Sequence, residues 1–399
     1  MERYESEPYL AEIEALPLAA GASEPGAPAP FYVELAETVL FPGGGGQPAD
    51  RGKLAGQPVA ALEKREDGRW RFYLPEPLAA ASSHRLELDW SHRYDLMQQH
   101  TAQHLLSAIA LDRFGWRTTA FHLGDELTDI ELDAELPAEK LAALEEAVAA
   151  AIRAAVPVRT RRVEKEEYEK LEGVRSRGLP AGHQGSVRLV EIEGIDLNTC
   201  GGTHLRSTAE IESLKLLHTE PMRGGTRLYW VAGGRVRARM AAGEARNARL
   251  RRLLDTGDSE LVSVLESRLE NLAELKRAKE KLEARLAEAE AAALEDRAFA
   301  ERHFEDGDLA FLQKLARSWQ AASGRGLLFL SAGKSKEAAF VIVTRGDLSF
   351  DLRSLGQEIA ALLEGKGGGA GKQFQGKATS LDRRAEAIAH LASAVEGGA

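Results

Sequence analysis

Two histidines, His100 and His104, stand four residues apart in the uncharged run MQQHTAQHLL, which extends from Met97 to Leu106. On a helix this spacing places both side chains on one face, with Cβ atoms roughly 5–6 Å apart, close enough for both to bind one ion. Two histidines on a helix face are also an ordinary feature of a buried core. The pair therefore predicts, at most, half of a metal site.

The other half lies in the segment NTCGGTHL, where Cys200 and His204 are again four residues apart. The Gly-Gly pair between them allows a turn in which both side chains point inward. Three imidazoles and one thiolate form a typical zinc ligand set. The sequence thus predicts a Zn²⁺ site with four ligands, His100, His104, Cys200 and His204. A closed site with all four bound would be structural, and three ligands plus a water would be catalytic.

The elements around these residues indicate an α+β domain over residues 91–235. Ser91 is the expected N-cap of a helix that carries the histidine pair and ends near Gly115. A strand pair is expected within 118–132 and an alanine-rich helix over 137–156. Further strands are expected at 187–192 and 227–231.

Residues 1–90 are expected to form a small β-barrel or sandwich. Short apolar runs such as 31–35 and 70–74 alternate with glycine and proline, and LFPGGGGQPADRGKL (40–54) predicts a long glycine-rich turn. Such short strands need a closed or double-layered arrangement to bury their apolar faces.

A long helical segment follows over residues 236–303. Five leucines fall on one heptad seam, which Lys279 interrupts: Leu265, Leu272, Leu275, Leu282 and Leu286. This pattern fits a helix packed on its own domain, an antiparallel hairpin or a homodimer arm. Residues 304–399 alternate strands and helices again, which predicts a separate α/β domain around the run GKGGGAGKQFQGK (365–377).

The composition is that of a globular protein without a membrane span. The chain has 399 residues, of which 44% are hydrophobic and 29% charged, so two to four domains are expected. Its single cysteine excludes an internal disulfide. We expect a cytoplasmic location, since no signal peptide or span of about 18 apolar residues is present. A net charge of −10 disfavours a protein coated for nonspecific nucleic-acid binding but allows local basic patches.

Taken together, these motifs resemble those of a known family. HTAQHLL together with CGGTHL and the following STAEI resembles the editing domain of alanyl-tRNA synthetases and the related second domain of threonyl-tRNA synthetases. FHLGDELTDIEL (121–132) is similar to the strand pair between those motifs, and LFPGGGGQPADRG to the glycine-rich loop of free-standing alanyl-tRNA editing proteins, the AlaX group. The C-terminal run resembles the DHH-associated domain that ends alanyl-tRNA synthetases. The layout is that of the long AlaX form.

The resemblance implies a zinc-dependent hydrolase that removes serine or glycine from mischarged tRNA(Ala). It carries the family's zinc ligands onto the same four residues, His100, His104, Cys200 and His204. Two departures are visible: Leu40-Phe41 replaces the usual aromatic pair before the glycine loop, and Ala370 interrupts the terminal glycine run.

Several further residues are expected to contact the substrate. Gln103, between the two histidines, is a candidate for a hydrogen bond to it, and Gly45 and Gln47 belong to a loop whose backbone can approach it closely. For tRNA, three lysines lie among C-terminal glycines, Lys366, Lys372 and Lys377. Two upstream clusters are weaker candidates: Arg159, Arg161 and Arg162, and then Arg175 and Arg177.

Two other functions stay open from the sequence. One is a non-catalytic tRNA-binding accessory module in which the zinc is structural. The other is a metal-dependent hydrolase of small substrates, which the C-terminal domain disfavours. The intact pair of four-residue spacings favours the editing hydrolase.

Overall fold

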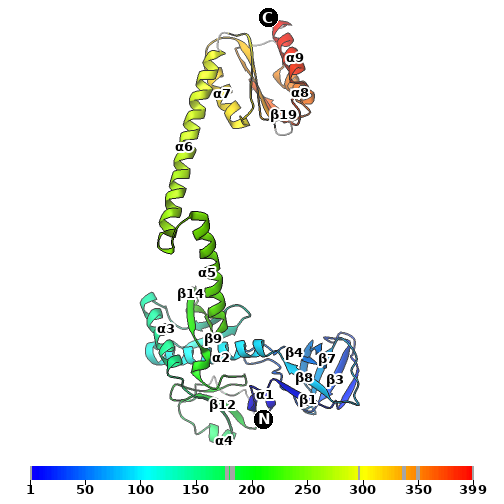
Figure 1. The fold of residues 1–399 in the computed structure, drawn as a ribbon, viewed down its shortest axis with the longest axis vertical. Helices are drawn as coiled ribbons and strands as arrows, with labels where there is room; N and C mark the ends of the chain where they lie inside the picture. The colour runs from blue at the N-terminus through cyan, green and yellow to red at the C-terminus, as the bar shows by residue number, and fades with distance from the viewer. Residues whose placement is uncertain are drawn as a thin grey trace. The chain divides into compact units, whose positions relative to one another are not determined.

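The computed structural model describes residues 2–175, 179, 185–294, 297–334, 338–346 and 351–397. It divides into two compact units, Met1–Arg249 and Leu250–Ala399, each shown in Figure 1. Its mixed helices and sheets agree with an α+β multidomain protein. The finer division into four domains at residues 90, 235 and 303 remains a prediction.

The N-terminal part of the first unit consists of two antiparallel four-stranded sheets, ordered β1-β8-β4-β5 and β2-β3-β7-β6. Both sheets face one apolar core that includes Val33, Leu54 and Phe72. The pairing is thus the two-sheet arrangement of a sandwich, and no described strand pair closes the sheets into a barrel. The elements are α1 (Arg3–Ser6), β1 (Glu12–Ala15), β2 (Ala19–Ala22), β3 (Phe31–Leu35), β4 (Gly52–Leu54), β5 (Gln57–Pro58), β6 (Ala61–Lys64), β7 (Trp70–Leu74) and β8 (His84–Leu88).

The rest of the first unit surrounds helix α2 (Trp90–Phe114). One sheet has the order β14-β15-β10-β9 and another the order β11-β12-β13, all antiparallel. Helices α2 and α3 pack with both sheets in a second core that includes Leu105, Val148 and Trp230. The elements are β9 (Thr118–Leu123), β10 (Thr128–Leu132), α3 (Ala138–Arg153), β11 (Val158–Val163), α4 (Lys165–Tyr168), β12 (Val187–Ile192), β13 (Asp196–Thr199), η1 (Thr208–Ile211), β14 (Leu214–Met222) and β15 (Gly225–Ala232).

A buried ion pair joins α2 to the N-terminal sheets. Arg93, in the first turn of α2, bonds Asp50 just after the glycine-rich loop, and both side chains are fully buried. Arg93 also donates to the backbone carbonyl of Val39 at 2.7 Å. Removing one partner of such a pair would leave an uncompensated buried charge. The glycine-rich loop is therefore tied to the helix that carries the histidines.

The helical segment predicted over 236–303 is interrupted once and ends before residue 303. The structure has two helices there, α5 (Gly234–Leu254) and α6 (Leu261–Ala293), separated by the short 3-10 helix η2 (Asp258–Glu260). Strand β16 (Phe299–Phe304) occupies the end of the predicted helix. Its parallel pairing with β17, which the local sequence does not reveal, overrides the helical tendency.

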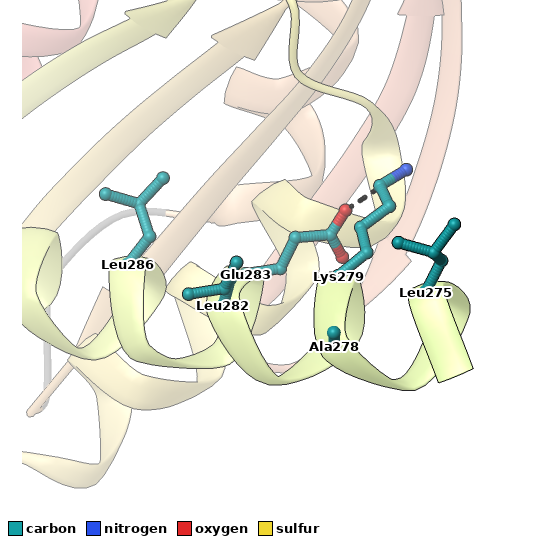
Figure 2. Close-up of a pocket in the computed structure, with 6 residues that line it drawn as sticks. All are labelled: Leu275, Ala278, Lys279, Leu282, Glu283 and Leu286. Carbon is teal, nitrogen blue, oxygen red and sulfur yellow. Dashed lines mark ion pairs between the residues drawn. The ribbon is translucent and has the colours of Figure 1, made fainter. Parts of the chain in front are cut away.

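The leucine seam lies on the exposed surface of α6 within its unit. All five of its leucines are between 44% and 67% exposed. A shallow hollow along this helix is lined by α6 residues alone, and Figure 2 shows them with the Lys279–Glu283 ion pair. The C-terminal end of α6, in contrast, packs through Ala287 and Ala291 into the core of the second unit.

The second unit contains a five-stranded sheet with the order β16-β17-β18-β20-β19. Helix α7 packs on one face, and α8 and α9 pack on the other (Figure 1). None of the described helices is long and apolar enough to cross a bilayer. The remaining elements are α7 (Leu309–Ala321), β17 (Gly326–Ala332), β18 (Ala338–Arg345), α8 (Leu352–Leu362), β19 (Lys366–Ala370), β20 (Gln373–Ala378) and α9 (Arg384–Gly397).

Candidate metal centre

Helix α2 carries the first two predicted ligands into the core. Asp89, not the expected Ser91, is its N-cap, because the Asp89 side chain accepts from the His92 N–H at 3.2 Å. The helix ends at Gly115 in a left-handed conformation with φ 73°, as the sequence predicts. His100 and His104 are buried on one face, and their ring centroids are 5.2 Å apart.

The loop after β13 brings the other two predicted ligands to the same place. Cys200 Sγ lies 3.4 Å from His100 Nε2 and 3.3 Å from His204 Nε2. One donor atom from each of the four residues lies within 4.8 Å of the other three. Three imidazole nitrogens and a thiolate at these separations can hold one metal ion.

Each imidazole is held by its other ring nitrogen. The His100 Nδ1–H donates to Gln47 Oε1 at 2.8 Å, and the His104 Nδ1–H donates to Asp196 Oδ2 at 3.0 Å. His204 Nδ1 hydrogen-bonds with Thr101 Oγ1 at 3.2 Å. Histidines that bind metals usually have such a partner, which sets the tautomer and the ring orientation. All three Nε2 atoms are thereby left for the cluster.

The charges of the cluster fit a cation at its centre. Burial opposes ionisation of Cys200, but the facing His100 and His204 outweigh it and hold the thiol pKa well below its usual value. Burial and then the charge of His100 lower the pKa of His204 to about 3. Burial also disfavours protonated His104, yet its bonds to Asp196 and Cys200 raise its pKa to about 10. A bound cation would replace the proton that His104 otherwise holds.

The glycine-rich loop approaches the cluster closely. All four glycines from Gly43 to Gly46 have positive φ, between 59° and 133°, a region that L side chains rarely adopt. A Cβ on Gly46 would lie 2.5 Å from the Phe121 ring. The predicted contact residue Gly45 lies at the exposed tip of this loop, with open space around it.

Gln47, predicted as a substrate contact, is buried against two residues of the metal site. Its Oε1 accepts from His100 Nδ1–H at 2.8 Å and from Thr203 N–H at 2.9 Å. Its Nε2 donates to Thr203 Oγ1 at 2.9 Å. The geometry therefore gives Gln47 a role in positioning His100 and the cysteine loop, which the sequence did not indicate.

Gln103, the other predicted contact residue, keeps one buried acceptor available. Its Nε2 donates to Ser107 Oγ at 2.9 Å, whereas its Oε1 is buried and has no partner among the described residues. Leaving a buried acceptor unpaired costs free energy, so this oxygen is suited to receive a hydrogen bond from a ligand.

Sequence reasoning missed three residues that support the ligands, namely Thr101, Asp196 and Arg188. Arg188 on β12 is buried, and its Nη1 donates to the backbone carbonyls of Cys200 at 2.6 Å and Gly202 at 2.7 Å. Asp196 was detectable as an acid four positions before Cys200. Arg188 had no local signal, because its contact depends on the pairing of β12 with β13.

A surface cavity of about 470 Å³ adjoins the cluster at His204. It lies between the N-terminal segment and β11. On its wall the Arg206 guanidinium stacks 3.7 Å from the Tyr9 ring centroid, and the Tyr9 hydroxyl donates to Glu210 at 2.6 Å. The cavity provides room for a ligand next to His204.

The arginines predicted upstream as RNA contacts are engaged in ion pairs. Arg159, Arg161 and Arg162 pair with Glu193, Glu167 and Glu5. Arg175 pairs with Asp112 at 2.6 Å, and Arg177 lies outside the described residues. Such ion pairs are the ordinary state of charged side chains on a solvated surface, and they require no RNA contact to explain them.

The C-terminal lysines lie on a glycine-rich hairpin formed by β19 and β20. Lys366 and Lys377 are exposed and directly opposite each other, and Lys372 is in the turn. Like charges directly opposite in a sheet are unfavourable. An anion bound between these lysines would remove that cost.

The sequence of this chain is similar to those of known proteins. A family model described as "Threonyl and Alanyl tRNA synthetase second additional domain" matches residues 187–253. The chain is 36% identical over 368 residues to the alanyl-tRNA editing protein Aarsd1 of Mus musculus, covering 90% of this chain and 88% of that protein. It is 31% identical over 226 residues to the alanyl-tRNA editing protein AlaX-L of Pyrococcus horikoshii, covering 54% of this chain and 53% of that one.

Two more distant similarities involve synthetases. The chain is 31% identical over 268 residues to the alanine–tRNA ligase of Hyperthermus butylicus, covering 64% of this chain but 29% of that enzyme. Among solved structures, the C-Ala domain of Aquifex aeolicus alanyl-tRNA synthetase is 23% identical, with a TM-score of 0.24, covering 26% of this chain and 94% of that domain.

Proposed function

The chain belongs to the family of alanyl-tRNA editing proteins, and from this premise we propose that it is a hydrolase that deacylates mischarged tRNA(Ala). The substrate would be an ester between serine, or glycine, and the terminal ribose of the tRNA. Water cleaves the ester bond and releases free amino acid and intact tRNA.

The observation that carries this proposal is the cluster of His100, His104, Cys200 and His204, whose donor atoms face one another. Zinc fits this set because it accepts both imidazole and thiolate ligands. When bound, it would supply Lewis acidity for an ester carbonyl or an anchor for the amino group of the substrate. Gln47, Thr101 and Asp196 keep the three imidazoles oriented for it.

Selectivity for serine over alanine requires a polar group that the serine hydroxyl can satisfy. We assign this role to Gln103, whose buried Oε1 lacks a partner in the described part of the chain. Serine can donate to this oxygen and alanine cannot, and a site that pairs with a substrate hydroxyl rejects the analogue that lacks it.

The body of the tRNA would be held elsewhere. We propose that Lys366, Lys372 and Lys377 contact its phosphates, since the opposed pair Lys366 and Lys377 favours an anion. A homodimer through the leucine seam of α6 belongs to the same proposal, because the seam is exposed within its own unit.

One observation favours a second function. Four protein donors converge, and four-coordinate zinc sites made only of protein ligands are usually structural. The chain would then be a tRNA-binding accessory module without hydrolytic activity.

The deciding experiment is deacylation of seryl-tRNA(Ala) and alanyl-tRNA(Ala), with metal content measured in parallel. Fast loss of serine, slow loss of alanine, and loss of both zinc and activity in Cys200→Ser would support the hydrolase. A zinc-loaded protein that binds tRNA and leaves both esters intact would favour the accessory module.

A further inference from the structure

Helix α5 (Gly234–Leu254) concentrates positive charge in an acidic protein. It has seven arginines and one glutamate, while the whole chain has a net charge of −10. Like charges three or four residues apart destabilise a helix, and several arginine pairs in α5 have this spacing. Such a composition is unfavourable unless the positive charge meets an anionic partner. The arginines are Arg235, Arg237, Arg239, Arg246, Arg249, Arg251 and Arg252.

Internal ion pairs account for only part of this charge. Arg235 pairs with Asp95 at 2.7 Å, Arg237 with Glu212, and Arg251 with Asp258. Arg239, Arg246 and Arg249 are exposed, and no carboxylate of the described residues pairs with them. Their guanidinium groups are therefore available to a ligand.

Arg239, Arg246 and Arg249 line up with the paired Arg235 along one side of α5. At 3.6 residues per turn, Arg235, Arg239, Arg246 and Arg249 fall within about 80° of the helix circumference, and the stripe is about 21 Å long. We call these four residues the arginine stripe. It lies within the unit that contains the metal centre.

The stripe begins beside the helix that carries the metal ligands. Arg235 bonds Asp95, which lies on α2 five residues before His100. The backbone N–H of Gly234 donates to Gln98 Oε1 at 3.1 Å. These contacts fix the start of α5 on α2, so a polyanion whose end is at the metal centre has the stripe nearby.

The chemistry of the stripe fits an RNA backbone. Arginine binds phosphate oxygens in a bidentate manner, and duplex RNA is recognised largely through its phosphates and ribose hydroxyls. A lipid surface fits less well, because the opposite face of α5 holds Arg237, Glu244 and Arg251 in place of an apolar band. We propose that the arginine stripe binds the phosphates of the tRNA acceptor stem. The identity of the RNA rests on the proposed function.

The test compares two triple variants that remove equal charge. R239Q/R246Q/R249Q removes three members of the stripe, and R277Q/K281Q/R285Q removes three exposed charges from α6. The dissociation constant for uncharged tRNA(Ala) is measured between about 50 and 200 mM salt. The stripe variant is expected to bind about tenfold more weakly, with a log–log salt slope shallower by about two to three, since each phosphate contact contributes about 0.7 to 0.9.

The remaining outcomes separate this inference from the proposed function. In deacylation assays the stripe variant should lose catalytic efficiency through a higher KM, with kcat unchanged. Its zinc content and thermal midpoint should also be unchanged. Equal tRNA binding by the stripe variant and the wild type, or an equal loss in the α6 variant, would overturn the inference. Stripe-dependent tRNA binding by a protein that hydrolyses no mischarged tRNA would overturn the proposed function alone. If the triple variant unfolds, Arg239→Gln and Arg246→Gln should each lower the slope by about one.

Discussion

Gln47 reaches His100 across 53 positions of the sequence, and its Oε1 accepts a hydrogen bond of 2.8 Å from the His100 Nδ1–H. The same oxygen accepts from the backbone N–H of Thr203, beside the ligand His204. One amide of the N-terminal part therefore touches both halves of the metal site.

Replacing Gln47 should weaken metal binding without unfolding the protein. In Gln47→Ala the His100 ring loses the acceptor that fixes its tautomer, and loss of such a partner typically costs 10–100-fold in metal affinity. Zinc affinity by competition with a chelator is the measurement, and Gln57→Ala on β5 is the control. Equal affinity of Gln47→Ala and wild type would contradict the positioning role.

The two adjacent glycines of the cysteine loop should respond differently to alanine. A Cβ on Gly202 would lie 2.3 Å from His100 Cε1 and 2.5 Å from Gln47 Oε1, whereas a Cβ on Gly201 meets nothing within 4 Å. We expect Gly202→Ala to lose at least about tenfold in metal affinity, because the His100–Gln47 contact must separate, and Gly201→Ala to stay within about twofold of the wild type. Matching losses in the two variants would show that the close approach is unimportant.

Reversing the charge of one of the opposed lysines in the C-terminal hairpin should raise the stability of the fold and lower its affinity for tRNA. Lys377→Glu turns a like-charge pair with Lys366 into an attractive one, which should raise the free energy of unfolding by about 0.2–1 kcal/mol. The same change should weaken tRNA binding, because a phosphate contact is lost. Denaturant melts and tRNA titrations measure the two effects, with Lys281→Glu on α6 as the control. Stabilisation without weaker binding would exclude this hairpin from the RNA contact.

The leucine seam of α6 predicts the oligomeric state. Leu275 and Leu282 are 67% and 63% exposed within their unit, so a dimer that covers them should dissociate when both become glutamate. Light scattering should give twice the chain mass for the wild type and for Ala273→Glu, which lies off the seam, and the single-chain mass for Leu275→Glu/Leu282→Glu. A wild type that is already monomeric would end the dimer hypothesis.

The convergence of the four candidate ligands was predictable because its signal is local. Four-residue spacing on a helix and the Cys-Gly-Gly-Thr-His turn place side chains together without knowledge of the rest of the fold. The strands at 118–132 and 187–192 followed from apolar alternation in the same way. Local patterns therefore indicated both the donors and the elements that carry them.

The partner that each supporting residue contacts was not predictable, because these contacts are not local in the sequence. The contact between His104 and Asp196 spans 92 positions and depends on how β13 packs beside α2. The N-cap at Asp89 prevailed over Ser91 because only Asp89 reaches the His92 N–H. Strand β16 forms where a helix was predicted, because it pairs with β17, which lies 28 residues later in the sequence. Each of these depends on tertiary packing, which a local pattern cannot contain.

The glycine-rich loop links the expected metal affinity of the site to the assembly of the N-terminal sheets. Gln47 orients one imidazole, and the Arg93–Asp50 pair ties its loop to α2, so we expect the site to reach full metal affinity only when the N-terminal sheets have docked. A chain that lacks residues 1–89, or in which they are damaged, would retain all four donors. It should nevertheless hold a metal ion weakly. Retention of an ion would therefore report whether the N-terminal part has folded around the site.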